Sequence, residues 1–413
     1  MYLVETTVIK PSSRLIYKTC DELCFLSKNL YNTVLYIQRQ NYQEGKPYIG
    51  YYDMLKLLRA QKNPDFYALP SYPAEYVAQQ VDTAYTSFFS KLKSKNEGRH
   101  NQKVNPPSYK DKVKGRNVIT FYKRKLSKTT YKKEGLIHIT KTNIKFKSKI
   151  PFEQIQQVKI VPKNGYYVLH VVYKTEEPKP INTENYAAID LGLNNLATVV
   201  TNVSSPFIIN GRPLKSINHR WNKRVSKAKS KLRKGVKTSK QIKNLTNKRE
   251  RRVNNYLHQT ASAIVKKFIL LGISKVVIGH NNGWKQNINL GKRNNQNFVQ
   301  IPFGRFIEIL TYKCTRVGIE AITGEESYTS KCSFLDNESV KKHEVYMGKR
   351  VKRGLFMSSD GTLINADVNG AYNIMKKHLG IRFNDLDPVQ VCSTPKVLKV
   401  DCGVNYKRPS DKL

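Results

Sequence analysis

The spacing of apolar side chains predicts that the chain begins with one strand and continues with helices. Residues 1–10 have the pattern of a short strand. From about Thr19 the apolar positions fall at helical spacing, so residues 19–37 and 74–92 each predict a helix with one apolar face. Residues 52–60 predict a shorter helix. Such faces are typical of core packing, so we expect these helices to form a folded helical region.

Residues 101–180 have the pattern of a β-rich region. Short alternating runs occur at residues 117–122, 136–140 and 144–147. Residues 158–173 hold Asn164-Gly165 between two alternating runs, which is the sharpest hairpin signal in the chain. Pro178 and Pro180 then mark a boundary.

The second half of the chain predicts three strands followed by alternating helices and strands. The strands are expected at residues 186–192, 196–202, 206–210, 276–279 and 319–323. The helices are expected at residues 215–271, 302–316 and 365–379, with Asn365 as an N-cap. This order is that of the RNase H-like fold, in which acids at the ends of central strands hold two hard cations. Residues 347–363 predict a hairpin, and residues 383–413 show no clear pattern and predict a tail.

Two aspartates stand where such a fold would place metal ligands. Asp190 ends an apolar strand, where an unpaired carboxylate is unfavourable by several kcal/mol, so it needs a partner or a metal. The alternative is a strand-end residue that caps a turn. Asp367 lies in the first turn of the last helix, where the macrodipole alone favours an acid.

The sequence offers two candidates for the third acid of the site. The strand at residues 276–278 should lie beside the Asp190 strand, but it ends in Gly279. The next strand is followed by Glu325 and Glu326, whose longer side chains can reach one strand further across the sheet. The two glutamates point in opposite directions if the backbone is extended, so only one should enter the site. The alternative is a solvated acidic loop.

The charge of the chain favours a nucleic-acid partner. Of its 413 residues, 73 are lysine or arginine and 30 are aspartate or glutamate, a net charge of 73 − 30 = +43. No run of about 18 apolar residues occurs, and the positive charge is not collected beside an apolar anchor, so we expect no membrane association. Six scattered cysteines favour a reducing cytoplasm over a disulfide framework.

The densest positive charge lies between Lys215 and Arg252, with 16 basic residues and only Glu250 as an acid. Most of these charges lack an opposite partner at i+4, so we expect a helical pair that follows the phosphates of a nucleic-acid duplex, with a solvated face as the alternative. The candidate contacts are Arg220, Lys223, Arg224, Lys227, Lys231, Arg233, Lys234, Arg249 and Arg252, with Lys285 in an amide-rich segment further on. Trp221 and the 25 tyrosines offer rings on which unpaired bases can stack.

Three segments resemble the TnpB family, RNA-guided nucleases encoded by bacterial and archaeal insertion sequences and related to type V CRISPR effectors. They are residues 188–197 (AIDLGLNNLA), 328–332 (YTSKC) and 365–374 (NADVNGAYNI), of which the first and last match the family's first and third RuvC motifs. The resemblance implies an α+β, multidomain fold. Its implied parts are a wedge-like β-barrel (residues 1–12 and 101–183), an inserted helical recognition lobe (13–100), an RNase H-like RuvC nuclease domain (184–380) and a C-terminal tail, possibly disordered (381–413).

The resemblance also implies the site and its cofactors. It gives Asp190 and Asp367 as ligands of Mg²⁺, with Mn²⁺ possible, and a transposon-end-derived guide RNA as partner. The chain departs from the family at Gly279, where the family usually has glutamate; by analogy with some relatives we expect Glu326 to complete the site, with Glu325 as the fallback. A second departure is the single Cys332 in place of two cysteine pairs, so we expect no zinc site, which needs about four ligands.

The function implied is cleavage of double-stranded target DNA beside a short adjacent motif, by a monomer within a ribonucleoprotein in the prokaryotic cytoplasm, associated with the nucleoid. Two alternatives remain open. One is a nuclease-inactive, RNA-guided DNA-binding repressor, which Gly279 motivates. The other is an RNA-independent, transposase-like protein, because an RNase H-like acid triad suits that chemistry as well.

Overall fold

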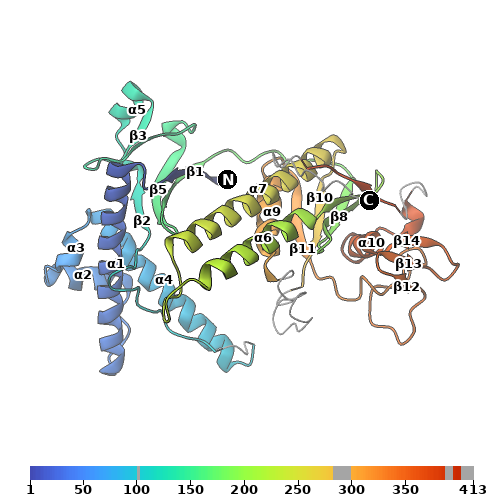
Figure 1. Ribbon diagram of the computed structural model, residues 1–413, viewed down its shortest axis with the longest axis horizontal. Helices are drawn as coiled ribbons and strands as arrows, with labels where there is room; N and C mark the ends of the chain where they lie inside the picture. Colours follow the sequence, from blue (N-terminus) through green and yellow to red (C-terminus); the bar gives the residue numbers. More distant parts are fainter. Residues whose placement is uncertain (100–102, 282–298, 387–393, 401–413) are drawn as a thin grey trace. The chain divides into compact units, whose positions relative to one another are not determined.

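The chain folds into two compact units, residues Met1–Glu176 and Glu177–Leu413 (Figure 1). We describe a computed structural model, which covers residues 1–99, 103–281, 299–386 and 394–400. Each unit has its own sheet and its own hydrophobic core, so each is described by itself.

The first unit contains a four-stranded antiparallel sheet in the order β1-β6-β5-β2. Its strands are β1 (Tyr2–Ile9), β2 (Ile119–Tyr122), β5 (Ile155–Pro162) and β6 (Tyr167–Lys174). The β5–β6 hairpin confirms the prediction from Asn164-Gly165, and Gly165 adopts the positive φ of +87° that the turn requires. Closure of this sheet into a barrel stays a prediction.

A block of helices is inserted between β1 and the other strands of that sheet. The helices are α1 (Arg14–Gln43), α2 (Tyr51–Ala60), α3 (Pro64–Tyr67) and α4 (Ser71–Asn96). The predicted apolar faces are buried in one core, which holds Leu30 and Val34 of α1 together with Val77 and Val81 of α4. The remaining small elements of this unit are α5 (Lys128–Glu134), β3 (Leu136–His138) and β4 (Lys145–Lys147).

The second unit contains a six-stranded sheet in the order β11-β10-β7-β8-β9-β15. Its strands are β7 (Tyr186–Asp190), β8 (Asn195–Thr201), β9 (Phe207–Asn210), β10 (Lys275–Gly279), β11 (Glu320–Gly324) and β15 (Lys396–Val397). β10 pairs in parallel with both β7 and β11, whereas β8 is antiparallel to β7 and β9. The predicted neighbour relation between the Asp190 strand and the strand that ends at Gly279 is confirmed.

Helices cover both faces of this sheet, which explains why β7 is almost continuously apolar. They are α6 (Arg212–Lys229), α7 (Lys240–Leu270), α9 (Phe303–Thr315) and α10 (Ala366–Leu379). Ile189 packs in a core with side chains of α7 and α9, whereas its neighbour Ala188 packs in a second core with side chains of α10. Successive residues of β7 therefore face opposite layers, and α10 lies alone on the side of Ala188 among these four helices.

The structure refines one expectation and corrects two. The helical stretch at residues 215–271, expected to hold a helical pair, is two helices, and the break between them lies at 230–239, where Gly235 has a positive φ of +85°. The expected hairpin at 347–363 is a three-stranded sheet of β12 (Lys349–Lys352), β13 (Leu355–Met357) and β14 (Leu363–Asn365). Residues after 383, expected to lack regular structure, include a short 3-10 helix (Phe383–Asp385) and β15, which pairs with β9. Among the described residues, no helix is both long and apolar enough to span a bilayer.

Candidate active site and nucleic-acid interface

Asp190 lies at the carboxyl end of β7, close to the first turns of α10. The first turns of α10 lie against this carboxylate: a Cβ at Gly370 would be in van der Waals contact with Asp190 Oδ2, at 3.5 Å. Burial raises the pKa of the Asp190 carboxyl, and the negative charges of Asp367 and Glu326 raise it further, to about 8. The three acids singled out from the sequence therefore share one electrostatic neighbourhood, in which bringing all three carboxylates to the charged state is unfavourable.

Asp367 stands at the start of α10, on the turn that Asn365 caps. The side-chain oxygen of Asn365 accepts hydrogen bonds from the backbone N–H groups of Asp367 (3.0 Å) and Val368 (3.2 Å), so the predicted N-cap is confirmed. The Asp367 carboxylate accepts a hydrogen bond from Asn195 Nδ2 at 2.8 Å and lies 3.9 Å from the Arg350 guanidinium. Sequence reasoning missed Asn195 and Arg350 as neighbours of this acid.

Glu326 follows the end of β11 and takes the place that Gly279 leaves open on β10. A Cβ at residue 279 would lie 2.9 Å from Glu326 Oε2 and 2.5 Å from Ile374 Cδ1. The backbone N–H of Glu326 donates to the side-chain oxygen of Asn281 at 3.1 Å. Strand β10 ends in a glycine, and the carboxylate that lies beside this end is that of Glu326, from the turn after β11.

Glu325, the fallback residue, points to other partners. Its exposed carboxylate pairs with Lys377 of α10 and accepts a hydrogen bond from the Ser327 backbone N–H at 2.8 Å. The hydrogen bond from Lys377 lowers the pKa of this carboxyl, whereas burial raises the pKa of Glu326. The neighbouring glutamates therefore sit in opposite environments.

The segment that follows Glu326 is held by the same helix that carries Asp367. Asn373 Nδ2 donates to the carbonyls of Thr329 (2.9 Å) and Cys332 (2.7 Å). Asn369 Nδ2 donates to the Cys332 carbonyl at 2.9 Å, and its side-chain oxygen accepts from the Phe334 N–H at 2.9 Å. Both asparagines are fully buried, so α10 fixes the loop of the third acid while carrying the second.

The carboxylates fit a hard divalent cation by their chemistry. Carboxylate oxygens are the ligands that Mg²⁺ and Mn²⁺ take in proteins, and the open space over Gly279 admits the third carboxylate. In this conformation no group of three or more His, Cys, Asp or Glu side chains among the described residues is placed to hold a metal ion. Asp367 is instead engaged by Asn195 and lies near Arg350, whose positive charge also lowers the pKa of Asp190 against the larger raising effects.

Cys332 lies in the loop for which the sequence predicts no zinc site. Its buried thiol is within hydrogen-bonding distance of the carbonyls of Ser339 (3.5 Å) and Lys341 (3.6 Å). The buried carboxylate of Glu338 accepts from the backbone N–H groups of Ser333 (2.7 Å) and Met347 (3.1 Å). Hydrogen bonds to one buried acid therefore tie the two ends of this loop together.

The basic residues proposed for nucleic-acid binding are distributed over two helices and the loop between them. Arg220, Lys223, Arg224 and Lys227 lie on α6, Lys231, Arg233 and Lys234 on the connection at 230–239, and Arg249 and Arg252 on α7. Lys285 lies outside the described residues. Arg249 differs from the rest, because its guanidinium donates to Asn218 Oδ1 (2.7 Å) and to the Gln300 carbonyl (2.9 Å).

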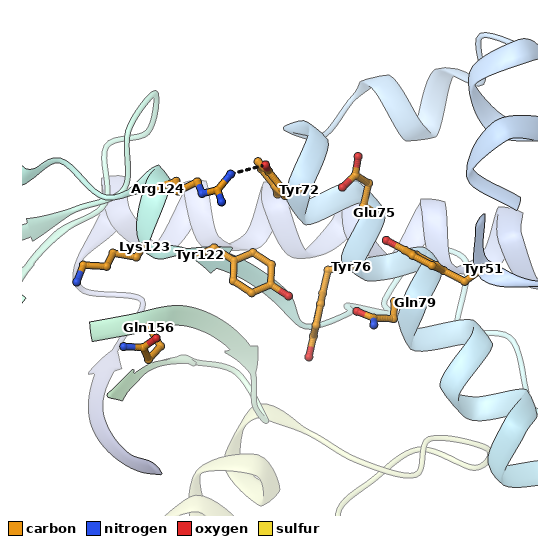
Figure 2. Close-up of a pocket in the computed structure, with 9 residues that line it drawn as sticks. All are labelled: Tyr51, Tyr72, Glu75, Tyr76, Gln79, Tyr122, Lys123, Arg124 and Gln156. Atoms are coloured by element: carbon orange, nitrogen blue, oxygen red, sulfur yellow. Dashed lines mark hydrogen bonds between the residues drawn. The ribbon is translucent and has the colours of Figure 1, made fainter. Parts of the chain in front are cut away.

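Four tyrosines gather in a hollow of the first unit, with a volume of about 440 Å³ (Figure 2). Figure 2 shows Tyr51, Tyr72 and Tyr76 from the helical block facing Tyr122 at the end of β2. Arg124 Nη1 donates to the Tyr72 hydroxyl at 2.9 Å, and the rings of Tyr76 and Tyr122 meet edge-on with centroids 6.2 Å apart. Composition alone left these tyrosines undistinguished among 25, since only the fold brings them together.

Comparison with known proteins agrees with the motifs. Residues 170–285 match the family OrfB_IS605, described as a probable transposase, and residues 303–374 match the Cas12f1-like TNB domain. A TnpB-like protein, ORF457 of Acidianus two-tailed virus, is 25% identical over 88% of this chain and 84% of its own length.

The solved structures that are similar to this chain share less of its sequence than the viral relative does. A CRISPR-Cas_phi3 mini-RNA-guided endonuclease has a TM-score of 0.47 at 11% identity, covering 91% of this chain and 92% of its own. The Cas12f1-sgRNA-target DNA complex gives 0.37 at 14% identity, with 90% and 98% covered. The two family matches and the viral relative together include all three motif segments, so they agree with the resemblance of this chain to the TnpB family.

Proposed function

We propose that the chain is an RNA-guided, divalent-metal-dependent DNA endonuclease of a transposable element. The observation that carries the proposal is that the charges of Asp367 and Glu326, acids from distant parts of the chain, both act on the buried carboxyl of Asp190 at the end of β7. A protein with a net charge of +43 that keeps three acids together, one with its pKa raised to about 8, is more readily explained by cation binding than by stability.

In this proposal Asp190, Glu326 and Asp367 would hold two Mg²⁺ or Mn²⁺ ions. Ions bound there would supply activation of a water for in-line attack and stabilisation of the leaving 3′ oxygen. Asp190 and Glu326 approach the site from neighbouring parts of the sheet, and Asp367 approaches from the capped start of α10. Asn195 donates a hydrogen bond to Asp367 and Arg350 lies 3.9 Å from it, so both side chains would stand beside a cation or phosphate bound at Asp367.

The guide RNA and the target strand bind to the cationic surfaces. The basic residues of α6, α7 and their connection neutralise backbone phosphates, so we expect a steep dependence of binding on salt. The tyrosine hollow of the first unit, with Lys123 and Arg124 beside it, offers rings and positive charge to a further stretch of nucleic acid. The resemblance to the TnpB family supports a transposon-end-derived RNA as guide and a short adjacent motif in the target.

One experiment separates this function from its alternatives. The protein is purified from cells that also carry the ends of its transposable element, the RNA that co-purifies is sequenced, and a plasmid with a matching target is incubated with the complex in Mg²⁺ or in EDTA. We expect cleavage only of the matched plasmid and only with metal. Matched binding without cleavage would indicate the nuclease-inactive repressor, and full activity after RNA removal would indicate the RNA-independent transposase.

A further inference from the structure

Trp221 lies between two hollows of the second unit, one basic and one polar. The first is a narrow groove between α6 and α7, and the described residues that line it include five cations and no acid: Arg220, Arg224, Lys248, Arg249 and Arg252. The second has a volume of about 380 Å³, and Glu250, Asn254 and Gln300 contribute to its lining. Trp221 and Arg249 line both hollows, so the two are adjacent.

The walls around Trp221 are fixed by contacts within the fold. The Arg249 guanidinium lies 4.9 Å from the centroid of the indole ring, held there by its hydrogen bonds to Asn218 and to the Gln300 carbonyl. The side-chain amides of Gln300 and Asn222 exchange two hydrogen bonds, of 2.9 and 3.1 Å. A ligand entering here meets a preorganised site, so little ordering of side chains opposes binding.

The chemistry of the two hollows matches the two parts of a nucleotide. Clustered arginine and lysine side chains bind phosphates, which suits the groove. The larger hollow combines an indole ring with one carboxylate, two planar amides and the guanidinium groups of Arg249 and Arg305, all of which can hydrogen-bond to the edges of bases. Its volume lies within the usual range of small-ligand sites. A base within a duplex is stacked between its neighbours, so only an unpaired base can lie with its face against the indole ring.

We propose that this site binds one unpaired nucleotide of a single-stranded nucleic acid, with its backbone along the groove and its base in the larger hollow against Trp221. The inference deepens the proposed function, since it rests on α6 and α7 lying along nucleic acid. It assigns Trp221 as a base contact and Arg249 as the residue that positions the ring.

Fluorescence tests the site directly, because the chain has two tryptophans and Trp284→Phe leaves Trp221 as the only reporter. The full-length variant, freed of RNA by salt, is titrated with an oligothymidylate of about a dozen nucleotides and with the same backbone carrying no bases. We expect quenching and tighter binding for the oligomer with bases, by roughly 5- to 150-fold, the effect of stacking one base. Equal affinity and equal fluorescence change for the two oligomers would overturn the proposal.

A hollow-filling variant tests the location without disturbing the core. Val299 lines the larger hollow and is 57% exposed, so Val299→Trp should fill the space and lower the preference for bases clearly below that of the unsubstituted protein. Binding is read by anisotropy of labelled oligomers, so the tryptophan that is added does not interfere. Val236, 50% exposed and lining neither hollow, provides the control Val236→Trp, which should keep the preference. A preference that survives Val299→Trp would refute the location. Loss of DNA cleavage with this preference intact would instead count against the nuclease function alone.

Discussion

Asp21 in the first unit and Asp190 in the second are aspartates placed in opposite environments. Asp21, on α1, accepts hydrogen bonds from Arg116 Nε and Nη2, both at 2.8 Å, and from the Tyr167 hydroxyl. The bonds from Arg116 lower the pKa of Asp21. Asp190 lies with two other acids, and its pKa is raised to about 8, first by burial and then by their charge.

Asp21 therefore stabilises its unit, whereas the charge of Asp190 opposes folding and must be offset by the rest of the fold. The Asp21 cluster joins α1, the segment before β2 and β6 through complementary charges, which stabilises the first unit. The acids around Asp190 repel one another, so their proximity opposes folding in the absence of a cation. Sites that act against local stability are where functional constraints are expected.

The largest effect is expected from Asp190→Ala. Removing this carboxylate should lower cleavage of a matched plasmid by more than about 100-fold, because even groups that only support metal ligands contribute 10- to 100-fold. RNA co-purification should be unchanged, since Asp190 is an acid on β7, whereas the residues proposed to bind RNA are cations of α6, α7 and their connection. Asp360→Ala, at an exposed turn between β13 and β14, is the control and should retain activity. Cleavage by Asp190→Ala at the wild-type rate would contradict the assignment.

The next test compares the adjacent glutamates through the isosteric changes Glu326→Gln and Glu325→Gln. The first removes a charge from the acid site and should reduce cleavage by about 10- to 100-fold. The second removes only the exposed pair with Lys377 and should alter the rate by less than about threefold, as expected for a surface ion pair. Initial rates at several Mg²⁺ concentrations measure both. The reverse order of effects would make Glu325 the third ligand.

A smaller effect is expected from Gly279→Ala. The added Cβ would lie within 3 Å of Glu326 Oε2 and of Ile374 Cδ1, so one of them must move. We expect about a tenfold weaker response to Mg²⁺, together with weaker Mn²⁺ binding by the metal-free protein, because a displaced ligand binds less well. Gly304→Ala is the control, since a Cβ there meets nothing within 4 Å. Unchanged Mn²⁺ affinity in Gly279→Ala would show that Glu326 can bind the cation without the space left by the missing side chain of Gly279.

Much of the fold could be predicted because its elements have strong local signals. The period of 3.6 in the first helices, Asn164-Gly165 in the hairpin and the apolar run before Asp190 each specify a local structure. The two-residue strand β15 could not be predicted, because its only signal is backbone pairing with β9, almost 190 residues earlier in the chain. The helical pair in the basic stretch was expected, but the position of its break at residues 230–239 was not, because the lysine-rich composition continues through it, although Gly235 marks the turn.

The candidate site was predictable where chemistry follows from local position. Asp190 and Asp367 stand at a strand end and a helix start, so the order of elements sufficed to single them out. The relation between Gly279 and Glu326 was visible only as a missing acid, since the contact crosses 47 residues of sequence. Asn195 and Arg350 carry no local signal at all, because their roles depend on the packing of separate strands beside α10.

The smallest effect, and the one that tests the comparison of the two aspartates itself, is the pH dependence of stability. Asp21 has a lowered pKa, so its contribution is present above the unfolded pKa of about 4 and is lost as the pH falls through the folded value. Asp190 has a raised pKa, so its contribution is greatest below about 4 and is lost as the pH rises through about 8. The two should therefore shape opposite limbs of the stability curve.

We expect Asp21→Asn to lower stability by about 1 kcal/mol at pH 7 and to have little effect at pH 3, as for a partly exposed charged pair with two hydrogen bonds. Asp190→Asn should instead raise the Tm of the metal-free protein at pH 8 relative to wild type, with the difference shrinking toward pH 5. Thermal unfolding in EDTA between pH 3 and 9 measures both. If Asp190→Asn lowered the Tm at pH 8 in EDTA, Asp190 would be a paired structural acid like Asp21, and the acid site would lose its physical basis.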